Sequence, residues 1–225
     1  MTYEEYISYH NQGDAGVEER MIASLCRHFA LTQWDAFRLI YYYTMTYHIP
    51  SALDMLLHNE RDVMRLQFRT DRRWVGIVPM RFARLLSELQ YEKLANLQRA
   101  TTTQQAYDIS SRWYYFGRYT AFLFLEVYCN VFKPKWEDNI VLGWEPEENY
   151  TKGAALITGS NNRDVLDDFL YKAKKDTGDN SFAIETSLCA VEKINKGTRW
   201  NGYYTERMLN EAQGTKYETL IYKLV

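Results

Sequence analysis

Apolar residues recur every three or four positions along most of the chain, which is the spacing of one helix face. The pattern predicts a helix after Asp14, whose side chain would cap the first turn, and a second helix from Thr32 to Pro50. A further helix is expected to restart behind Ser51. Pro79 stands where proline fits the first turn of another helix.

The second half of the chain continues this pattern with one interruption. Residues 133–149 lose the periodicity and predict a long ordered loop, with a short strand at 139–144 as one option. Helices are expected around this loop, over 101–116, 150–159, 162–176, 181–196 and 203–213. The sequence therefore predicts a single all-α domain over 1–225, with N-terminal helices in 1–100 and the distinctive motifs in 101–225.

Composition narrows the class of protein. The chain is 46% apolar and 25% charged, as folded globular proteins are, and it has no uncharged apolar stretch long enough to cross a membrane. No signal-peptide pattern opens the sequence, so a cytoplasmic protein is expected. The cysteines and histidines are scattered and no nucleotide-binding glycine motif is present, so we expect no metal, cofactor or histidine triad.

Charge is unevenly distributed, although the net charge is only −2. Residues 61–118 hold eleven lysine and arginine residues against five acidic ones, whereas 136–148 hold five acidic residues and no basic one. A local excess of positive charge can form a phosphate-binding face on a nearly neutral protein. A solvated helix face explains the same excess equally well.

One motif places a glycine and an arginine among aromatic residues, in the stretch YYFGRYTAFLFLEVY at 114–128. Gly117 would follow one helix and open the next, which is the sequence form of a helix–hairpin–helix. In that form the glycine lets backbone N–H groups approach a phosphate, and the helix N-terminus adds positive potential. The alternative is a core helix with a flexible start.

A second motif, TGSNNRDVLDDF at 158–169, places Asn161 and Asn162 in a turn just before Arg163. Backbone N–H groups, side-chain amides and one guanidinium could converge there on an anion. An ordinary N-cap followed by an exposed arginine explains the same residues.

Two more motifs lie closer to the C-terminus. In IETSLC at 184–189, Glu185 and two hydroxyl residues stand within an otherwise apolar helix. A buried carboxylate there would act as a general base or bind an amine, and an internal cap or a buried salt bridge to an arginine is the alternative. In TRWNGYYTER, Tyr203 and Arg207 share one helical face, and Arg199 would reach that face from the preceding turn.

Taken in this order, the four motifs resemble those of the bacteriophage amino acid:DNA transferases, also called alpha-glutamyl/putrescinyl thymine pyrophosphorylases. The resemblance rests on YFGRYTAF, TGSNNRDVL, IETSLCAVEKINKG and RWNGYYTER, and it covers about residues 105–210. The family is similar to the helical domain attached to phage 5-hydroxymethyluracil DNA kinases and is related to helix–hairpin–helix DNA glycosylases. The resemblance therefore implies a glycosylase-like helical fold and, for a phage protein, the host cytoplasm.

The chain departs from the glycosylase hairpin in one informative position. That hairpin often reads G-x-G-R-K-T-A, and Tyr119 takes the place of the lysine that is catalytic in bifunctional glycosylases. This departure argues against Schiff-base chemistry. The glycosylase aspartate follows this helix, where the present chain offers Glu137 and Asp138.

The resemblance implies a transfer reaction. A kinase pyrophosphorylates 5-hydroxymethyluracil in double-stranded DNA, and the transferase displaces the pyrophosphate with the amine of an amino acid, such as glycine, or of a polyamine. Such a reaction needs a flipped base, positive charge for the leaving group and a carboxylate that accepts the proton of the amine.

We assign the motif residues to these needs. The leaving pyrophosphate would be bound by Asn161, Asn162, Arg163, Arg199 and Arg207. The DNA would be held by Gly117, Arg118, Tyr119 and Tyr203. Glu185, or else Asp138, would take the proton from the amine, and Arg72 or Arg73 could bind the carboxylate of an amino acid donor.

Two other functions fit the same motifs. A DNA glycosylase-like enzyme would cut the base–sugar bond and leave abasic sites. A non-catalytic helical subunit would bind DNA in a salt-sensitive manner and present it to a separate modified-base kinase.

Overall fold

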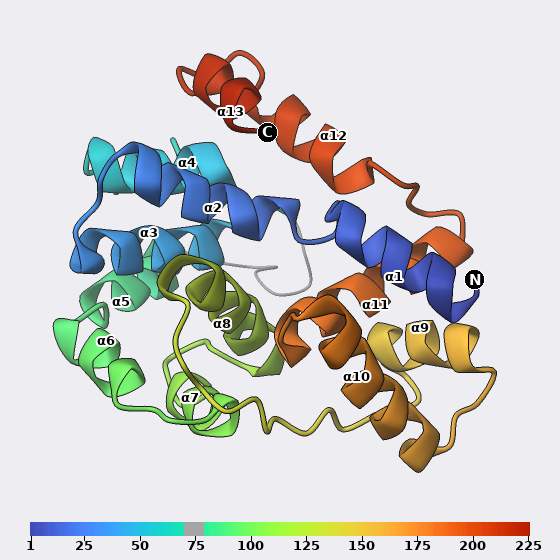
Figure 1. Cartoon of the computed structure of the whole chain (residues 1–225). Coiled ribbons are helices and arrows are strands. Elements are labelled where there is room, and N and C mark those ends of the chain that lie inside the picture. The colour runs from blue at the N-terminus through green and yellow to red at the C-terminus, as the bar shows by residue number, and fades with distance from the viewer. Residues whose placement is uncertain (70–78) are drawn as a thin grey trace. The chain divides into compact units, whose positions relative to one another are not determined.

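The computed structural model describes residues 1–69 and 79–225 and confirms the predicted all-α class (Figure 1). Thirteen helices lie in these residues, which form no strand. Contacts divide the chain into two units, one made of Met1–Val17 and Ile140–Arg207, the other of Glu18–Asn139 and Met208–Val225. Neither unit begins or ends at residue 100, where the sequence was divided into N-terminal helices and a motif-bearing half. The single domain stays a prediction.

The first unit joins the N-terminal helix to helices from the second half of the chain. Its helices are α1 (Tyr3–Gln12), α9 (Asn149–Thr158), α10 (Arg163–Thr177), α11 (Ser181–Asn195) and the first residues of α12 (Tyr203–Ala212). Helix α1 packs on α9, α10 and α11, and the fully buried ring of Tyr6 lies 5.4 Å from that of Phe169 in α10. Helices α9 and α11 approach so closely that a Cβ on Gly153 would lie 2.1 Å from the backbone oxygen of Leu188.

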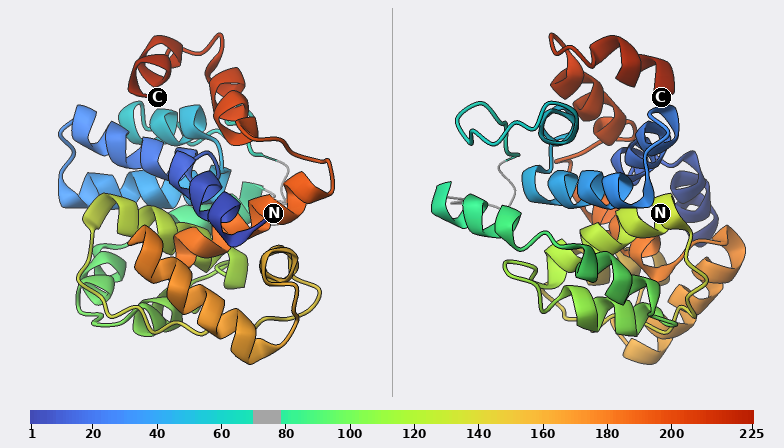
Figure 2. Two further views of the ribbon diagram at one scale, coloured as in Figure 1. Left: turned by 45° about the vertical axis from the view of Figure 1, so that its right-hand side comes forward. Right: turned by 90° about the vertical axis from the view of Figure 1, so that its left-hand side faces the viewer.

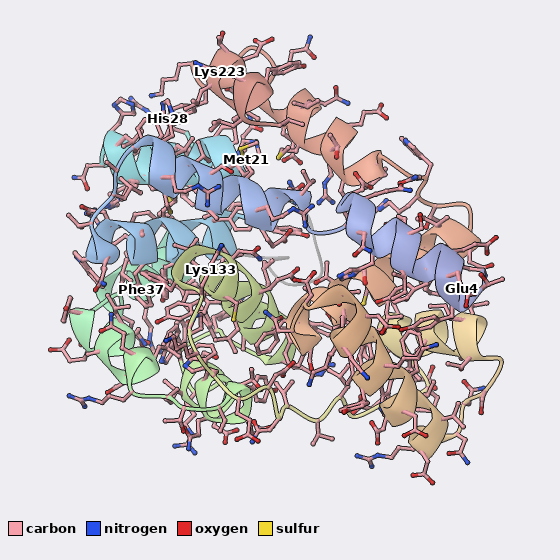
Figure 3. All side chains as sticks on the ribbon, in the orientation of Figure 1. Glu4, Met21, His28, Phe37, Lys133 and Lys223 are labelled. Carbon is pink, nitrogen blue, oxygen red and sulfur yellow. The ribbon has the colours of Figure 1, made fainter. Side chains whose placement is uncertain are left out.

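The second unit has an aromatic core. Its helices are α2 (Val17–His28), α3 (Gln33–Thr46), α4 (Ile49–Leu57), α5 (Pro79–Ser87), α6 (Tyr91–Gln98), α7 (Thr103–Ser110), α8 (Arg118–Phe132), the last residues of α12, and α13 (Glu218–Leu224). Phe37 of α3, which Figure 3 labels, packs its ring edge-on against Phe124 of α8 at 5.6 Å and against Trp113 at 6.2 Å. These contacts join α3 and α8 to the turn that precedes α8.

Two predicted helix boundaries were wrong, and the optional short strand does not form. Helix α4 begins at Ile49 behind His48, and Pro50 lies in its first turn, where the missing N–H costs no helical hydrogen bond. The helix expected over 101–116 ends at Ser110, because the following residues turn to bury Phe116. Residues 139–144 alternate between buried and exposed as a strand would, but they form no strand with any described residue.

A buried ion network lies at the centre of the second unit. The Arg69 guanidinium donates to Glu18 at 2.8 Å, pairs also with Glu211 of α12, and lies 4.1 Å from the ring centroid of Tyr47. The hydroxyl of Tyr43 donates to the same Glu18 carboxylate at 2.7 Å. The charges of the network are therefore paired and hydrogen-bonded, as burial requires.

We expect Gly153→Ala to destabilise the protein. The added methyl would overlap the backbone of α11, and overpacking of this kind costs about 1–3 kcal/mol. Thermal unfolding should show a melting temperature lower by several degrees. Gly117→Ala is the matched control, because a Cβ there meets nothing within 4 Å. Equal melting temperatures for the two variants would contradict the close α9–α11 contact.

His48 predicts a pH dependence of stability. Its Nδ1 accepts the N–H of Ser51 and caps α4, while burial and then the nearby charge of Arg69 lower the pKa of the ring to about 4. In the unfolded chain, His48 therefore takes up a proton near pH 6.5, whereas in the folded chain the ring is still neutral at that pH. The contribution of His48 is fully present above pH 6.5 and is lost as the pH falls towards 4, by up to about 3 kcal/mol.

The matched variant is His48→Asn, which keeps a capping acceptor and removes the titrating ring. Urea unfolding between pH 7 and pH 4 should show a steeper loss of stability in the wild type than in this variant. Parallel curves for the two proteins would show that His48 does not titrate as its burial requires.

Candidate functional site

The carboxylate of Asp14 occupies the start of α12. It accepts the backbone N–H groups of Gly202 at 3.1 Å, Tyr204 at 3.3 Å and Thr205 at 2.9 Å, and the Thr205 hydroxyl at 2.8 Å. The prediction that this side chain caps the helix after it was wrong, because only the backbone oxygen of Asp14 serves α2, through the N–H of Val17. The side chain instead fixes a helix start far along the chain.

Beside this cap lies a group of cations and rings that we call the α12 cluster: Arg199, Trp200, Tyr203, Tyr204 and Arg207. The guanidinium carbons of Arg199 and Arg207 lie 4.0 and 5.5 Å from the ring centroid of Tyr203. Arg207 also lies 4.9 Å from the ring centroid of Tyr204. The spacing of the motif predicted this shared face, and the structure brings the three residues together as expected.

The α12 cluster presents both charge and aromatic surface. Trp200 is 52% exposed, and its ring stands edge-on to Tyr203 at 5.0 Å. Arg199 donates to the backbone oxygen of Thr198 at 3.3 Å and forms no ion pair with any described residue. A half-buried guanidinium without a carboxylate is available for an anionic ligand.

The turn at 159–163 lies elsewhere in the same unit. Asn162 accepts the N–H of Asp164 at 2.8 Å and caps α10, while the side chain of Arg163 is 62% exposed and lies 3.9 Å from Asp167. Asn161 is exposed in the turn. Figures 1 and 2 show the start of α10 and the start of α12 at opposite ends of this unit. The structure therefore does not unite this turn with the α12 cluster, and its residues have the geometry of an ordinary cap.

The two candidate bases lie in different units. Glu185 is on α11 with 5% exposure, and the thiol of Cys189 donates to its Oε1 at 3.6 Å. Asp138 follows α8 and is half-buried, and its carboxylate accepts the Thr103 hydroxyl at 3.1 Å. The expected burial of Glu185 is confirmed, whereas its role as a base stays a prediction.

The hairpin residues occupy the start of α8. Gly117 is the exposed N-cap with a φ of −72°, which any residue adopts. Its expected role in letting backbone N–H groups approach a phosphate stays a prediction. The unusual backbone lies instead at Tyr115, with a φ of 66°. The Arg118 guanidinium lies 4.8 Å from the ring centroid of Phe122, and Tyr119 is 39% exposed.

A serine, a histidine and an aspartate meet in the first unit, although the scattered histidines of the sequence predicted no histidine triad. His10 Nδ1 lies 2.9 Å from Ser187 Oγ, and its Nε2 lies 2.8 Å from Asp179 Oδ2. Ser187 is only 2% exposed, and its Oγ also lies 2.9 Å from the Tyr6 hydroxyl. The group is a polar connection between α1, α11 and the turn before α11, in which His10 and Ser187 are buried and Asp179 is exposed. Its only sequence signal was the four-residue spacing of Tyr6 and His10.

Other ligand sites find no support in the described residues. Nowhere in them do three histidine, cysteine, aspartate or glutamate side chains gather in a way that could hold a metal ion. None of the helices in 1–69 and 79–225 has the length and apolarity that a membrane span needs. Arg72 and Arg73 lie outside the described residues.

We expect Asp14→Ala to loosen the start of α12. The change removes the acceptor of three N–H groups and one hydroxyl, and loss of a cap costs about 1–2 kcal/mol. Asp14→Asn keeps one side-chain oxygen and should recover most of that stability. Chemical denaturation measures the difference, and equal losses in the two variants would show that the capping oxygen is not the stabilising feature.

No protein-family model, curated protein or solved structure matches the chain. The α12 cluster and the buried Glu185 are therefore judged by their own geometry.

Proposed function

We propose that the chain is a phage DNA hypermodification enzyme that displaces pyrophosphate from 5-pyrophosphoryloxymethyluracil in double-stranded DNA. The attacking group would be the amine of an amino acid, such as glycine, or of a polyamine. The observation that carries the proposal is the α12 cluster, in which two guanidiniums flank one tyrosine ring. The identity of the substrate rests on the resemblance of the four motifs.

The α12 cluster suits a pyrophosphate leaving group. When the C–O bond breaks, both electrons and the negative charge go to pyrophosphate, and preorganised cations at that point lower the barrier. Arg199 and Arg207 supply two such cations. Tyr203 holds both side chains in place, and the exposed ring of Trp200 offers a face on which an unstacked base could lie.

The main-chain donors of α12 do not take part. The Asp14 carboxylate already accepts the N–H groups at the start of this helix, so the leaving group would be bound by side chains alone. Arg163 stays in the proposal as a separate phosphate contact, because its turn lies away from α12.

Glu185 is the proposed proton acceptor. The amine nitrogen forms the new bond to the exocyclic methylene only as a neutral group, and its surplus proton passes to a carboxylate. Glu185 is buried on α11, with 5% exposure. Asp138 is the alternative, although a hydroxyl already bonds its carboxylate.

The second unit would hold the DNA. Gly117 and Tyr119 are exposed at the start of α8, beside the half-buried Arg118, where a helix N-terminus favours phosphate. A 5-hydroxymethyluracil DNA kinase would supply the pyrophosphorylated base. No contact of the described residues specifically favours base excision.

Arg199→Ala and Arg207→Ala should each lower the rate of transfer by about two orders of magnitude, because each removes a charge that stabilises the leaving group. Pyrophosphate release from pyrophosphorylated DNA in the presence of glycine or putrescine measures the effect in single turnovers. Arg27→Ala is the control, since this arginine is exposed on α2 and bonds only Ser24 among the described residues.

The outcomes separate the alternatives. Full rates in both cluster variants would overturn the assignment of the α12 cluster. Loss of rate in Arg163→Ala alone would move the pyrophosphate to the turn before α10. Pyrophosphate that stays bound while abasic sites appear would identify a glycosylase.

A further inference from the structure

Two arginines of the basic segment, Arg81 and Arg84, lie at one turn of the second unit. The guanidinium of Arg84 lies 3.9 Å from the ring centroid of Tyr114, and that of Arg81 lies 5.5 Å from Tyr115. Arg81 also donates to the Tyr115 hydroxyl at 2.8 Å. Helix α5 thus delivers two cations to two adjacent rings. We call these four residues the hairpin surface.

The core holds the hairpin surface in place from beneath. Trp113 and Phe116, on either side of the two tyrosines, pack their rings on Phe124 at 5.1 and 5.6 Å. The core also anchors α5, because the hydroxyl of Tyr41 donates to the backbone oxygen of fully buried Leu85 at 3.2 Å. Such anchoring preorganises a binding surface, which reduces the entropy lost on binding.

The region around the hairpin surface carries an excess of positive charge. Between residues 79 and 118 the chain carries six lysine and arginine residues against three acidic ones. Arg84 has one acidic partner, Glu88 at 3.2 Å, and stays 61% exposed. Lys93 of α6 adds a third cation, 4.6 Å from the ring centroid of Trp113. An exposed ion pair such as Arg84–Glu88 contributes little free energy, so a phosphate can take the place of the carboxylate.

We infer that the hairpin surface binds an unpaired strand of DNA, with Arg81 and Arg84 on phosphates and Tyr114 and Tyr115 against bases. Cations interleaved with aromatic rings are the general means by which proteins hold single strands, because every base has a flat face to stack. Bases within a duplex hide those faces. The inference extends the DNA contact of Gly117, Arg118 and Tyr119 to another helix, and in this it rests on the proposed function.

The test is binding of an unmodified, fluorescently labelled thymidine oligonucleotide of about 15 nucleotides, followed by anisotropy over a range of salt concentrations. Each phosphate contact on a single strand contributes about 0.7 to the slope of log affinity against log salt. The Arg81→Gln/Arg84→Gln variant should therefore lose about 1.4 from this slope and bind at least tenfold more weakly at low salt.

The matched control is Arg27→Gln/Arg65→Gln, which removes the same charge from exposed positions of the same unit. Tyr114→Leu should weaken binding to the single strand about tenfold with no change in slope, because it removes a stacking face and no charge. Circular dichroism establishes that each variant is folded. Equal losses in the two double variants, or wild-type binding to duplex as tight as to single strand, would overturn the inference.

Three further outcomes are informative, and the last two distinguish this inference from the proposed function. Polyglutamate that competes as well as DNA would assign the hairpin surface to acidic proteins. If the Arg81→Gln/Arg84→Gln variant binds DNA as tightly as the wild type while Arg199→Ala still lowers the rate of transfer, the inference about the hairpin surface is wrong and the proposed function stands. If binding depends on them but the wild type transfers no amine, the proposed function fails and the hairpin surface stands.

Discussion

The site depends on one carboxylate placed at the start of one helix. Asp14 binds the free N–H groups of α12 and so determines where that helix begins. The helix start in turn places Tyr203, whose ring centroid lies 4.0 Å from the Arg199 guanidinium and 5.5 Å from the Arg207 guanidinium. An acidic side chain is well suited to this position because it opposes the partial positive charge of the helix end.

The same constraint decides the chemistry available to the α12 cluster. A helix start without a cap could bind a phosphate through its backbone, but here the protein's own carboxylate fills that position. Binding of a leaving group must come from guanidiniums, which form forked contacts with phosphate and keep their charge at every relevant pH. The hairpin surface of the second unit follows a similar plan, in which rings anchored in the core hold arginines at the surface. In both places aromatic residues position cations.

Local features of the sequence predicted much of this structure. Helical periodicity located α3, α9, α10 and α11 well, and the spacing of Arg199, Tyr203 and Arg207 correctly placed them on one face. Prediction failed where a residue acts at long range. Asp14 has the residue type and the position expected of a local helix cap. Its side chain instead binds Gly202 and Thr205, far along the chain. His10, Ser187 and Asp179 meet only after α1 packs on α11. Trp113 and Phe116 end a helix early because their rings are needed in the core, which propensity alone does not reveal.

The most direct test of the proposed function is mass spectrometry of the nucleosides released from pyrophosphorylated 5-hydroxymethyluracil DNA after incubation with the wild-type protein and a mixture of amino acids and polyamines. The account predicts a new nucleoside heavier than thymidine by one amine residue, which also identifies the donor. Unchanged nucleosides, from protein that is folded and binds the DNA, would contradict it and leave a helical DNA-binding subunit in its place.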